Sequence, residues 1–167
     1  MNNLNELQNN LEYKFKNINL LKTALSHTSY AHENSKLKSN ERLEFLGDAV
    51  LELLVSQFLY RNFPRVPEGK LTKLRAAIVC EDSLSKFAKE CHFDQYVLLG
   101  KGEEHSGGRT RPALLCDLFE AFLGALYLDK GFIFVKQFVY EHVIPLIENK
   151  EIEFDNDYKS VLQELVQ

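Results

Sequence analysis

Three carboxylates interrupt an otherwise apolar stretch of the sequence at residues 40–50. Glu41, Glu44 and Asp48 stand three and four residues apart, a spacing that puts all three on one face of a helix. Like charges one turn apart repel each other, and a carboxylate in apolar surroundings needs a counter-charge or a proton. An unoccupied acidic face of this kind is therefore unfavourable, and a divalent cation would neutralise it.

A second helical stretch, residues 114–129, repeats the arrangement. It is apolar apart from Asp117, Glu120 and the closing Asp129, and the first two acids lie one turn apart on the same face as Gly124. With Ala121 beside it, this face is smooth enough for a neighbouring helix to approach closely. Such an approach would bring Asp117 and Glu120 opposite the acids of the first stretch, so that four carboxylates converge.

The alternative is that these acids mark the solvated stripes of two amphipathic helices. A solvated face normally mixes Lys with Glu at a spacing of four, but no lysine interleaves these acids. The stripe is also narrow, and it is flanked by large apolar residues, namely Phe45, Leu51, Val55, Leu118 and Leu128. The pattern favours a metal or acid–base site, and an oxygen-only cluster suits a hard cation.

The chain is expected to be an all-α domain of ordinary size. Its 167 residues are 45% hydrophobic, enough for one core, and it has no period-2 runs of β-branched residues. Pro64 and Pro67 separate two helices, and the glycines of residues 100–110 predict a loop. Helices are predicted at residues 4–11, 18–25, 39–61, 68–77, 81–92, 111–128 and 132–147, with a last one beginning near 157.

The cysteines and the amino terminus predict a cytoplasmic protein. Three cysteines without a Cys-x-x-Cys pair are typical of reduced thiols; a zinc site from Cys80, Cys91 and His92 is a minor alternative. Residues 1–7 have neither the basic region nor the apolar core of a secretory signal. Acidic residues interrupt every long apolar stretch, so no membrane span or membrane partner is expected.

Residues 40–51 resemble the signature helix of ribonuclease III, the family of double-stranded-RNA endonucleases. Further segments resemble that family in the same order, and the similarity covers residues 11–131. One departure is Cys116, where a small residue such as Ala commonly precedes the Asp; a free Cys is itself small and tolerates burial. The further matching segments are residues 11–17, 24–31, 67–76, 99–104, 106–109 and 117–121.

The resemblance implies a homodimeric endoribonuclease that hydrolyses double-stranded RNA with Mg²⁺, or alternatively Mn²⁺. It assigns Glu44, Asp117 and Glu120 to the metal, and Asp48 and Glu120 to catalysis. Products would carry 5′-phosphate and 3′-hydroxyl ends. Ribosomal RNA precursors are the implied substrates, along with other structured messenger and transfer RNA transcripts, and no DNA is expected as a partner.

The resemblance also bears on residues around the acids. Phe45 resembles the aromatic that enters a socket on the partner subunit, whereas packing against the chain's own next helix is the alternative. Glu41 and Glu68 would have secondary roles, although the helix dipole alone accounts for Glu68. His27 is expected to be a structural residue rather than a catalytic base.

Net charge is −4, so the domain alone is expected to hold RNA weakly. Arg109 and Arg111 either grip backbone phosphates or are ordinary solvated residues of a Gly-rich loop. Basic residues gather in two segments, one with Arg61, Arg65, Lys70, Lys73 and Arg75, the other with Lys101, His105, Arg109 and Arg111.

The expected organisation is a catalytic domain at residues 1–149, a linker at 150–156 and, at 157–167, the start of a truncated double-stranded-RNA-binding domain. Two rival functions remain. An all-α nucleotide pyrophosphohydrolase would also pair carboxylates on two helices around Mg²⁺, but it would not account for Phe45. A catalytically dead RNA scaffold of the same fold conflicts with the presence of all four acids.

Overall fold

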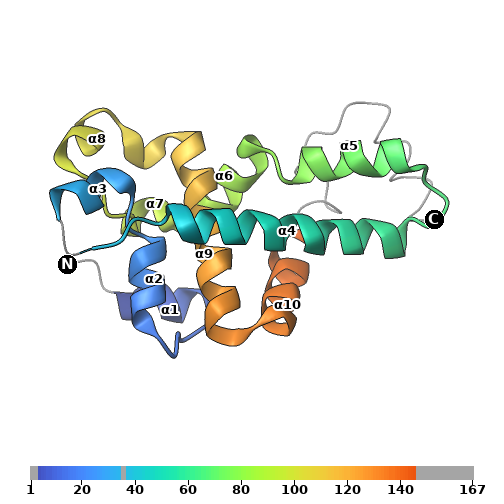
Figure 1. Ribbon diagram of the computed structural model, residues 1–167, viewed down its shortest axis with the longest axis horizontal. Helices are drawn as coiled ribbons and strands as arrows, with labels where there is room; N and C mark the ends of the chain where they lie inside the picture. Colours follow the sequence, from blue (N-terminus) through green and yellow to red (C-terminus); the bar gives the residue numbers. More distant parts are fainter. Residues whose placement is uncertain (1–3, 35–36, 146–167) are drawn as a thin grey trace.

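A computed structural model describes residues 4–34 and 37–145 of the chain. In this range the protein is built from helices and has no strand, apart from one isolated bridge between Ser26 and Leu98. The expected all-α fold class is confirmed. The elements, drawn in Figure 1, are α1 (Leu4–Asn10), α2 (Ile18–Ala24), α3 (Thr28–Glu33), α4 (Glu41–Asn62), α5 (Glu68–Ile78), α6 (Glu81–Glu90), α7 (Phe93–Tyr96), α8 (Lys101–His105), the 3-10 turn η1 (Gly108–Thr110), α9 (Pro112–Lys130) and α10 (Phe132–His142).

Helix α9 is the centre of the core. Pro112 occupies its first turn, where no backbone donor is needed, and its side chains from Leu118 to Leu126 are buried except Glu120. It packs against α2, α4, α6 and α10. Figure 1 shows α4 as the longest helix, with α9 crossing its first half and α5 alongside its second half. None of the described helices combines the length and apolarity that crossing a bilayer requires.

The crossing of α4 and α9 is a contact between two backbones. A Cβ added at Gly47 of α4 would lie 1.8 Å from the carbonyl oxygen of Glu120. A Cβ at Gly124 of α9 would lie 2.2 Å from the carbonyl oxygen of Leu43. The close approach predicted from the small residues of α9 is therefore present, and it depends equally on Gly47, which the sequence argument did not use.

Three short helices were not predicted. Residues 100–110, expected to be a loop, contain α8 and η1, and α3 and α7 lie in other segments read as connections. Helices this short are unstable alone and depend on tertiary contacts. Here Gly100 donates its N–H to Ser29 Oγ at 2.9 Å and Lys101 donates its N–H to Glu33 Oε1 at 2.8 Å.

The long helices match their predicted ranges to within two residues, except that α10 ends at His142 instead of residue 147. The spacing of Leu43, Leu46, Val50 and Leu53 in the sequence predicts that all four point into the core, and this prediction is wrong for Leu53. Leu43 and Val50 are buried, but Leu53 is 55% exposed, because ten residues along a helix rotate a side chain about 80° away from Leu43. The expected linker at 150–156 and the helix near 157 lie outside the described residues.

We predict that Gly47→Ala lowers the free energy of unfolding by about 1–3 kcal/mol, because a backbone carbonyl must move to admit the methyl group. Urea unfolding would measure this loss. Gly69→Ala is the matched control, since Gly69 lies in α5 with nothing near its missing Cβ. There alanine should stabilise the helix by up to about 1 kcal/mol. Equal stability of the two variants would contradict the tight crossing.

Candidate active site

The crossing of α4 and α9 brings four of the predicted carboxylates together: Glu44 and Asp48 from α4, Asp117 and Glu120 from α9. Glu120 lies at the centre of this group. Its pKa is raised to about 8, first by burial and then by the charges of Asp48, Asp117 and Glu44. We call these four residues the acid cluster.

The pKa values of two neighbours of Glu120, Glu44 and Asp117, are shifted in the same direction. Burial raises the pKa of Glu44, and the charges of Asp117, Glu41 and Asp48 add to the effect. Burial also raises the pKa of Asp117; the charge of His27 opposes this shift. Among the ion pairs of the described residues, none neutralises a member of the acid cluster. The cluster therefore concentrates negative charge that no ion pair of the described residues neutralises.

The tightest group of potential metal ligands lies on α9. Cys116 Sγ and one carboxylate oxygen each of Asp117 and Glu120 lie within 4.8 Å of one another. The two acids of α4 lie across the helix crossing, outside this tight group but close enough to affect the pKa of Glu120. Buried carboxylate oxygens without a counter-charge are the donors that a hard divalent cation prefers. The residues present therefore fit such a cation.

Cys116 takes part in this arrangement, which the sequence argument did not anticipate. Its half-buried thiol donates a hydrogen bond to Glu120 Oε1 at 3.9 Å. Burial raises the thiol pKa to about 12, with further contributions led by the charges of Glu120 and Asp117. The sequence does indicate this contact, because a spacing of four residues puts Cys116 on the same helical face as Glu120.

Glu81 is a second residue that the sequence argument missed. It lies in the first turn of α6, a helix packed against α9, and its charge raises the pKa of both Asp117 and Cys116. Glu81 thus adds negative charge beside the acid cluster. Nothing in the local sequence indicates this, because the two helices meet only through the tertiary fold.

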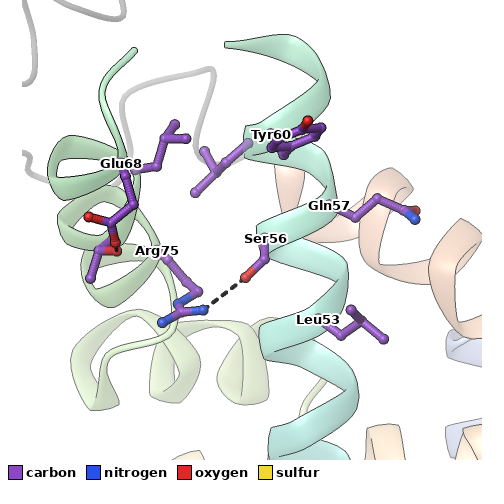
Figure 2. A pocket seen from close by; sticks show the side chains of 9 residues that line it. Leu53, Ser56, Gln57, Tyr60, Glu68 and Arg75 are labelled. Atoms are coloured by element: carbon purple, nitrogen blue, oxygen red, sulfur yellow. Dashed lines mark hydrogen bonds between the residues drawn. The ribbon is translucent and has the colours of Figure 1, made fainter. Parts of the chain in front are cut away.

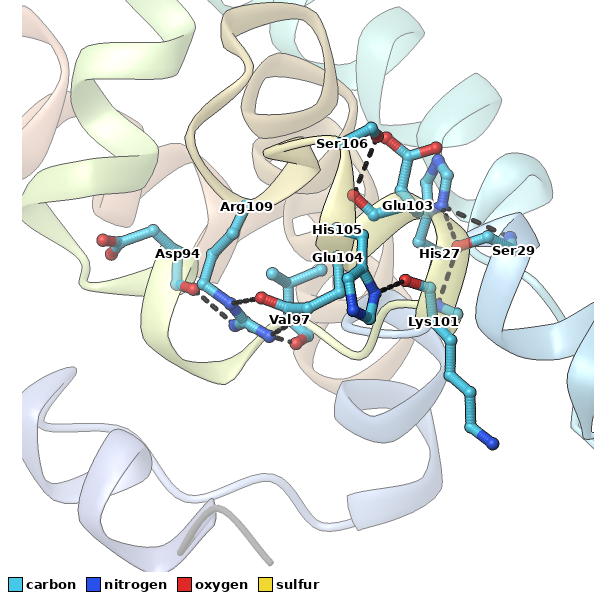
Figure 3. Close-up of polar contacts among 11 residues, drawn as sticks. His27, Ser29, Asp94, Val97, Lys101, Glu103, Glu104, His105, Ser106 and Arg109 are labelled. Atoms are coloured by element: carbon cyan, nitrogen blue, oxygen red, sulfur yellow. Dashed lines mark hydrogen bonds and ion pairs between the residues drawn. The ribbon is translucent and has the colours of Figure 1, made fainter.

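His27 has the structural role expected of it. Its ring Nδ1 accepts a hydrogen bond from the backbone N–H of Ser29 at 3.3 Å and also lies 2.8 Å from Ser29 Oγ, so the side chain caps the start of α3 (Figure 3). Glu41 accepts a hydrogen bond from Ser39 Oγ at 2.7 Å. Glu68, in the first turn of α5, accepts one from Thr72 Oγ1 at 2.7 Å.

Neither alternative for the loop arginines describes Arg109, which is a structural residue. Its guanidinium donates to the carbonyl oxygens of Asp94 at 2.7 Å and Val97 at 3.1 Å, and it forms an ion pair with Glu104 (Figure 3). These bonds attach η1 to the end of α7.

Arg111 is likewise engaged by the protein. It forms an ion pair with Glu103 at 2.6 Å and donates to Ser106 Oγ at 3.2 Å. Arg111 nevertheless remains exposed, so its ion pair is compatible with the alternative of a solvated loop arginine.

Phe45 does not pack against the chain's own next helix, because its side chain is 80% exposed. Leu53 and Tyr60, also exposed, lie within about a quarter turn of Phe45 on α4. We call these three residues the α4 apolar strip. Beside it, α4 and α5 enclose a groove of about 370 Å³, across which Arg75 donates to Ser56 Oγ at 3.0 Å (Figure 2).

The minor alternative of a zinc site at Cys80, Cys91 and His92 finds no support among the described residues. These three do not form a group of ligand atoms close enough to share an ion. Cys80 Sγ instead contacts the carbonyl oxygen of Ala77 at 3.2 Å and Ser83 Oγ at 3.3 Å. Burial raises the pKa of Cys91 to about 12.

Comparison with known proteins agrees with this geometry. The sequence model of the family described as ribonuclease-III-like matches residues 17–147. Ribonuclease 3 of Enterococcus faecalis is 60% identical over 164 residues, which cover 97% of this chain and 71% of that protein.

Solved structures agree as well. The nuclease domain of ribonuclease III from Campylobacter jejuni is 42% identical with a TM-score of 0.79, over 84% of this chain and 96% of that one. Dicer from Pichia stipitis is 29% identical with a TM-score of 0.61, over 84% of this chain and 61% of that one.

The fold and the acid cluster define the class as an all-α domain with an acidic cluster that could hold a divalent cation. The chain belongs to the ribonuclease III family. This membership confirms the endoribonuclease expected from the sequence and the divalent-metal dependence that goes with it.

The raised pKa of Glu120 predicts how the stability of the metal-free protein depends on pH. An unfolded Glu ionises near 4.5, whereas Glu120 in the folded protein ionises near 8. Between these values the folded state holds the extra proton, so the free energy of unfolding should fall as the pH rises from 5 to 8. Urea unfolding in the presence of a chelator measures this slope.

Glu120→Gln is the matched variant, because it keeps the shape of the side chain and removes its titration. Its slope between pH 5 and 8 should be flatter than that of the wild type, and added Mg²⁺ should stabilise the wild type most at pH 8. Identical slopes for the two proteins would show that Glu120 ionises normally.

Proposed function

We propose that the acid cluster is the active site of an endoribonuclease that hydrolyses double-stranded RNA with a divalent cation. The observation that carries the proposal is the half-buried carboxyl of Glu120, whose pKa is raised to about 8 by burial and by the charges of three other acids, in a chain of the ribonuclease III family. Such a cluster is unfavourable without a cation. Without a cation the acid cluster thus lowers the stability of the folded protein, and phosphodiester hydrolysis would need a cation at this same position.

The roles of the acids follow from their chemistry and from the family. Glu44, Asp117 and Glu120 would hold Mg²⁺, with Mn²⁺ as the alternative, and Asp48 and Glu120 would act in catalysis. When bound, the cation would act as a Lewis acid, which activates water and offsets negative charge at the scissile phosphate. Glu120 must release its carboxyl proton to serve as a ligand, and a cation lowers its pKa from about 8.

The products would carry 5′-phosphate and 3′-hydroxyl ends. Water adds to phosphorus, the bond from phosphorus to the 3′ oxygen breaks, and that oxygen leaves with a proton. Asp48 and Glu120 are the carboxylates that would orient the attacking water and hold its proton. No side-chain nucleophile is needed.

Binding of the RNA would rest on basic side chains outside the acid cluster. Arg61 at the end of α4 and Arg65 just after it are exposed, as are Lys70 and Lys73 of α5, so they are free to meet phosphates. Arg75, Arg109 and Arg111, which bond within the protein, contribute less. Because the net charge of the chain is −4, affinity should be modest and strongly dependent on salt.

The natural substrates would be ribosomal RNA precursors and other structured transcripts in the cytoplasm, rather than DNA. The rival nucleotide pyrophosphohydrolase is tested directly by separate incubation with mixed nucleoside triphosphates and with a long RNA duplex. Cleavage of the duplex alone would support the proposal, and hydrolysis of the triphosphates alone would overturn it.

We also propose that the protein is a homodimer formed through α4. Phe45 would insert into a socket on a second copy, and the α4 apolar strip supports this because large exposed apolar side chains gather on one face of the helix. The Campylobacter jejuni domain is itself described as having a region involved in dimer formation. Two acid clusters in one dimer would cut both strands across the wide, shallow minor groove of A-form RNA.

We predict that Glu120→Gln abolishes cleavage of an RNA duplex while the protein stays folded. The substitution removes a ligand charge without changing the shape of the side chain. Loss of transition-state stabilisation should lower the rate by several orders of magnitude, at about 1.4 kcal/mol for each factor of ten. A gel assay with a labelled duplex and Mg²⁺ measures the rate.

Glu141→Gln is the control for this experiment, since Glu141 is exposed on α10 and accepts a hydrogen bond from Gln137 outside the cluster. Its rate should match the wild type. Near-normal cutting by Glu120→Gln would overturn the assignment of the active site. Unfolding of that variant, seen by circular dichroism, would instead indicate a structural Glu120.

We predict that Phe45→Ala weakens self-association by a few kcal/mol, the typical loss when an aromatic anchor is removed from an interface hot spot. Sedimentation equilibrium measures the dimer constant. Ile133→Ala is the matched control, because Ile133 is also apolar and 84% exposed but lies on α10. A monomeric wild type at micromolar concentration, or equal effects of both substitutions, would remove the support for a Phe45 socket.

A further inference from the structure

The thiol of Cys116 gives the proposed metal centre a donor of a different chemical character. Cys116 Sγ, Asp117 and Glu120 contribute ligand atoms within 4.8 Å of one another, so a cation held by the two carboxylates would have the sulfur beside it. Mg²⁺ takes oxygen ligands in a near-octahedral arrangement and gains little from sulfur. Zinc and cadmium ions prefer thiolate ligands.

The spacing of these atoms suits one tetrahedral ion. Zinc bonds of about 2.3 Å to sulfur and about 2.0 Å to a carboxylate oxygen imply a separation of roughly 3.5 Å between the two ligand atoms. Cys116 Sγ lies 3.9 Å from Glu120 Oε1, so a small rotation of either side chain would bring both onto one ion. Asp117 supplies a third ligand, and one position is left for solvent.

We propose that Cys116 makes this centre a mixed thiolate and carboxylate site for a thiophilic divalent cation such as Zn²⁺, which competes with Mg²⁺ and inhibits cleavage. On binding, the thiol loses its proton to solvent and a metal–sulfur bond forms, with no change in oxidation state. Zn²⁺ and Mg²⁺ both need Asp117 and Glu120, so their binding is mutually exclusive. This inference rests on the proposed function of the acid cluster.

The acids around Cys116 attract a cation, although the same surroundings keep the proton on the thiol until a cation displaces it. Glu81 from α6 places a further negative charge near both Cys116 and Asp117. The sulfur is half-buried, which reduces competition from solvent for the metal–sulfur bond. The thiol has one protein partner, the carboxylate of Glu120, and a shared cation would replace that weak hydrogen bond with two coordination bonds.

Cadmium ion provides the test, because a cadmium–thiolate bond absorbs in the ultraviolet by charge transfer and can be seen without an activity assay. The full chain would be reduced, stripped of metal with a chelator and titrated with Cd²⁺. The wild type should show the band, and Cys116→Ala and Cys116→Ser should lack it. Cys91→Ala is the matched control and should retain it, since Cys91 does not belong to the ligand group; the whole series is made in Cys80→Ala protein, because Cys80 is an exposed thiol that acts on Cys116.

Competition between Zn²⁺ and a chromophoric chelator gives the affinity. Cys116→Ser keeps the size of the side chain but replaces sulfur with a hard oxygen. Losing the sulfur ligand should weaken Zn²⁺ binding at least as much as losing an outer-shell partner does, roughly 10–100-fold. The Mg²⁺ concentration for half-maximal cleavage should shift far less, so the ratio of the two midpoints is the decisive quantity.

Two results would overturn the inference: a cadmium band that survives in Cys116→Ala, or zinc and magnesium midpoints that shift equally. Failure of the proposed function is distinguishable from both. A wild type that shows the Cys116-dependent band but does not cut duplex RNA with Mg²⁺ would refute the function and leave the metal site standing. Cleavage of duplex RNA by a wild type that shows no such band would support the function and refute the thiolate metal site.

Discussion

The backbone contact between α4 and α9 sets the position of everything else in the centre of this protein. Because a Cβ at Gly47 would lie 1.8 Å from the carbonyl oxygen of Glu120, the two helices cross as closely as their main chains permit. One residue beyond Gly47 on α4 stands Asp48, and Glu120 belongs to the contact itself. The distance between the acids of the two helices is therefore fixed by main-chain packing rather than by flexible side chains.

This packing has an electrostatic consequence. Four carboxylates that would repel each other are held together by the crossing of α4 and α9, and the residues next to Asp117 and Glu120 on α9, Leu118, Phe119 and Ala121, are buried. The folded protein responds by raising the pKa of Glu120 to about 8. Hydrophobic burial along α9 thus holds the carboxylates together against their mutual repulsion, and binding of a cation would reduce that repulsion.

The sequence predicted the parts of this centre that depend on local periodicity. The spacing of Glu44, Asp48, Asp117 and Glu120 was sufficient to predict two acidic helical faces, and Gly124 indicated their close approach. It could not predict Glu81, whose helix α6 meets α9 only in the tertiary fold. Likewise α8 and η1 depend on tertiary contacts, such as the hydrogen bonds from Arg109 to the carbonyl oxygens of Asp94 and Val97. No local sequence pattern predicts these contacts.

Helix α4 carries two kinds of surface. Its first turns present Glu44 and Asp48 toward α9, while Phe45 and Leu53 face outward. The α4 apolar strip and the two acids of α4 lie on one rigid helix. A partner that covers the strip would therefore also hold the acid cluster in a fixed orientation relative to the partner. If the proposed dimer forms, the spacing between its two centres is then set by the same helix that builds each one. Assembly and chemistry would then share a single structural element, because the exposed Phe45 directly follows Glu44, a member of the acid cluster, in the sequence.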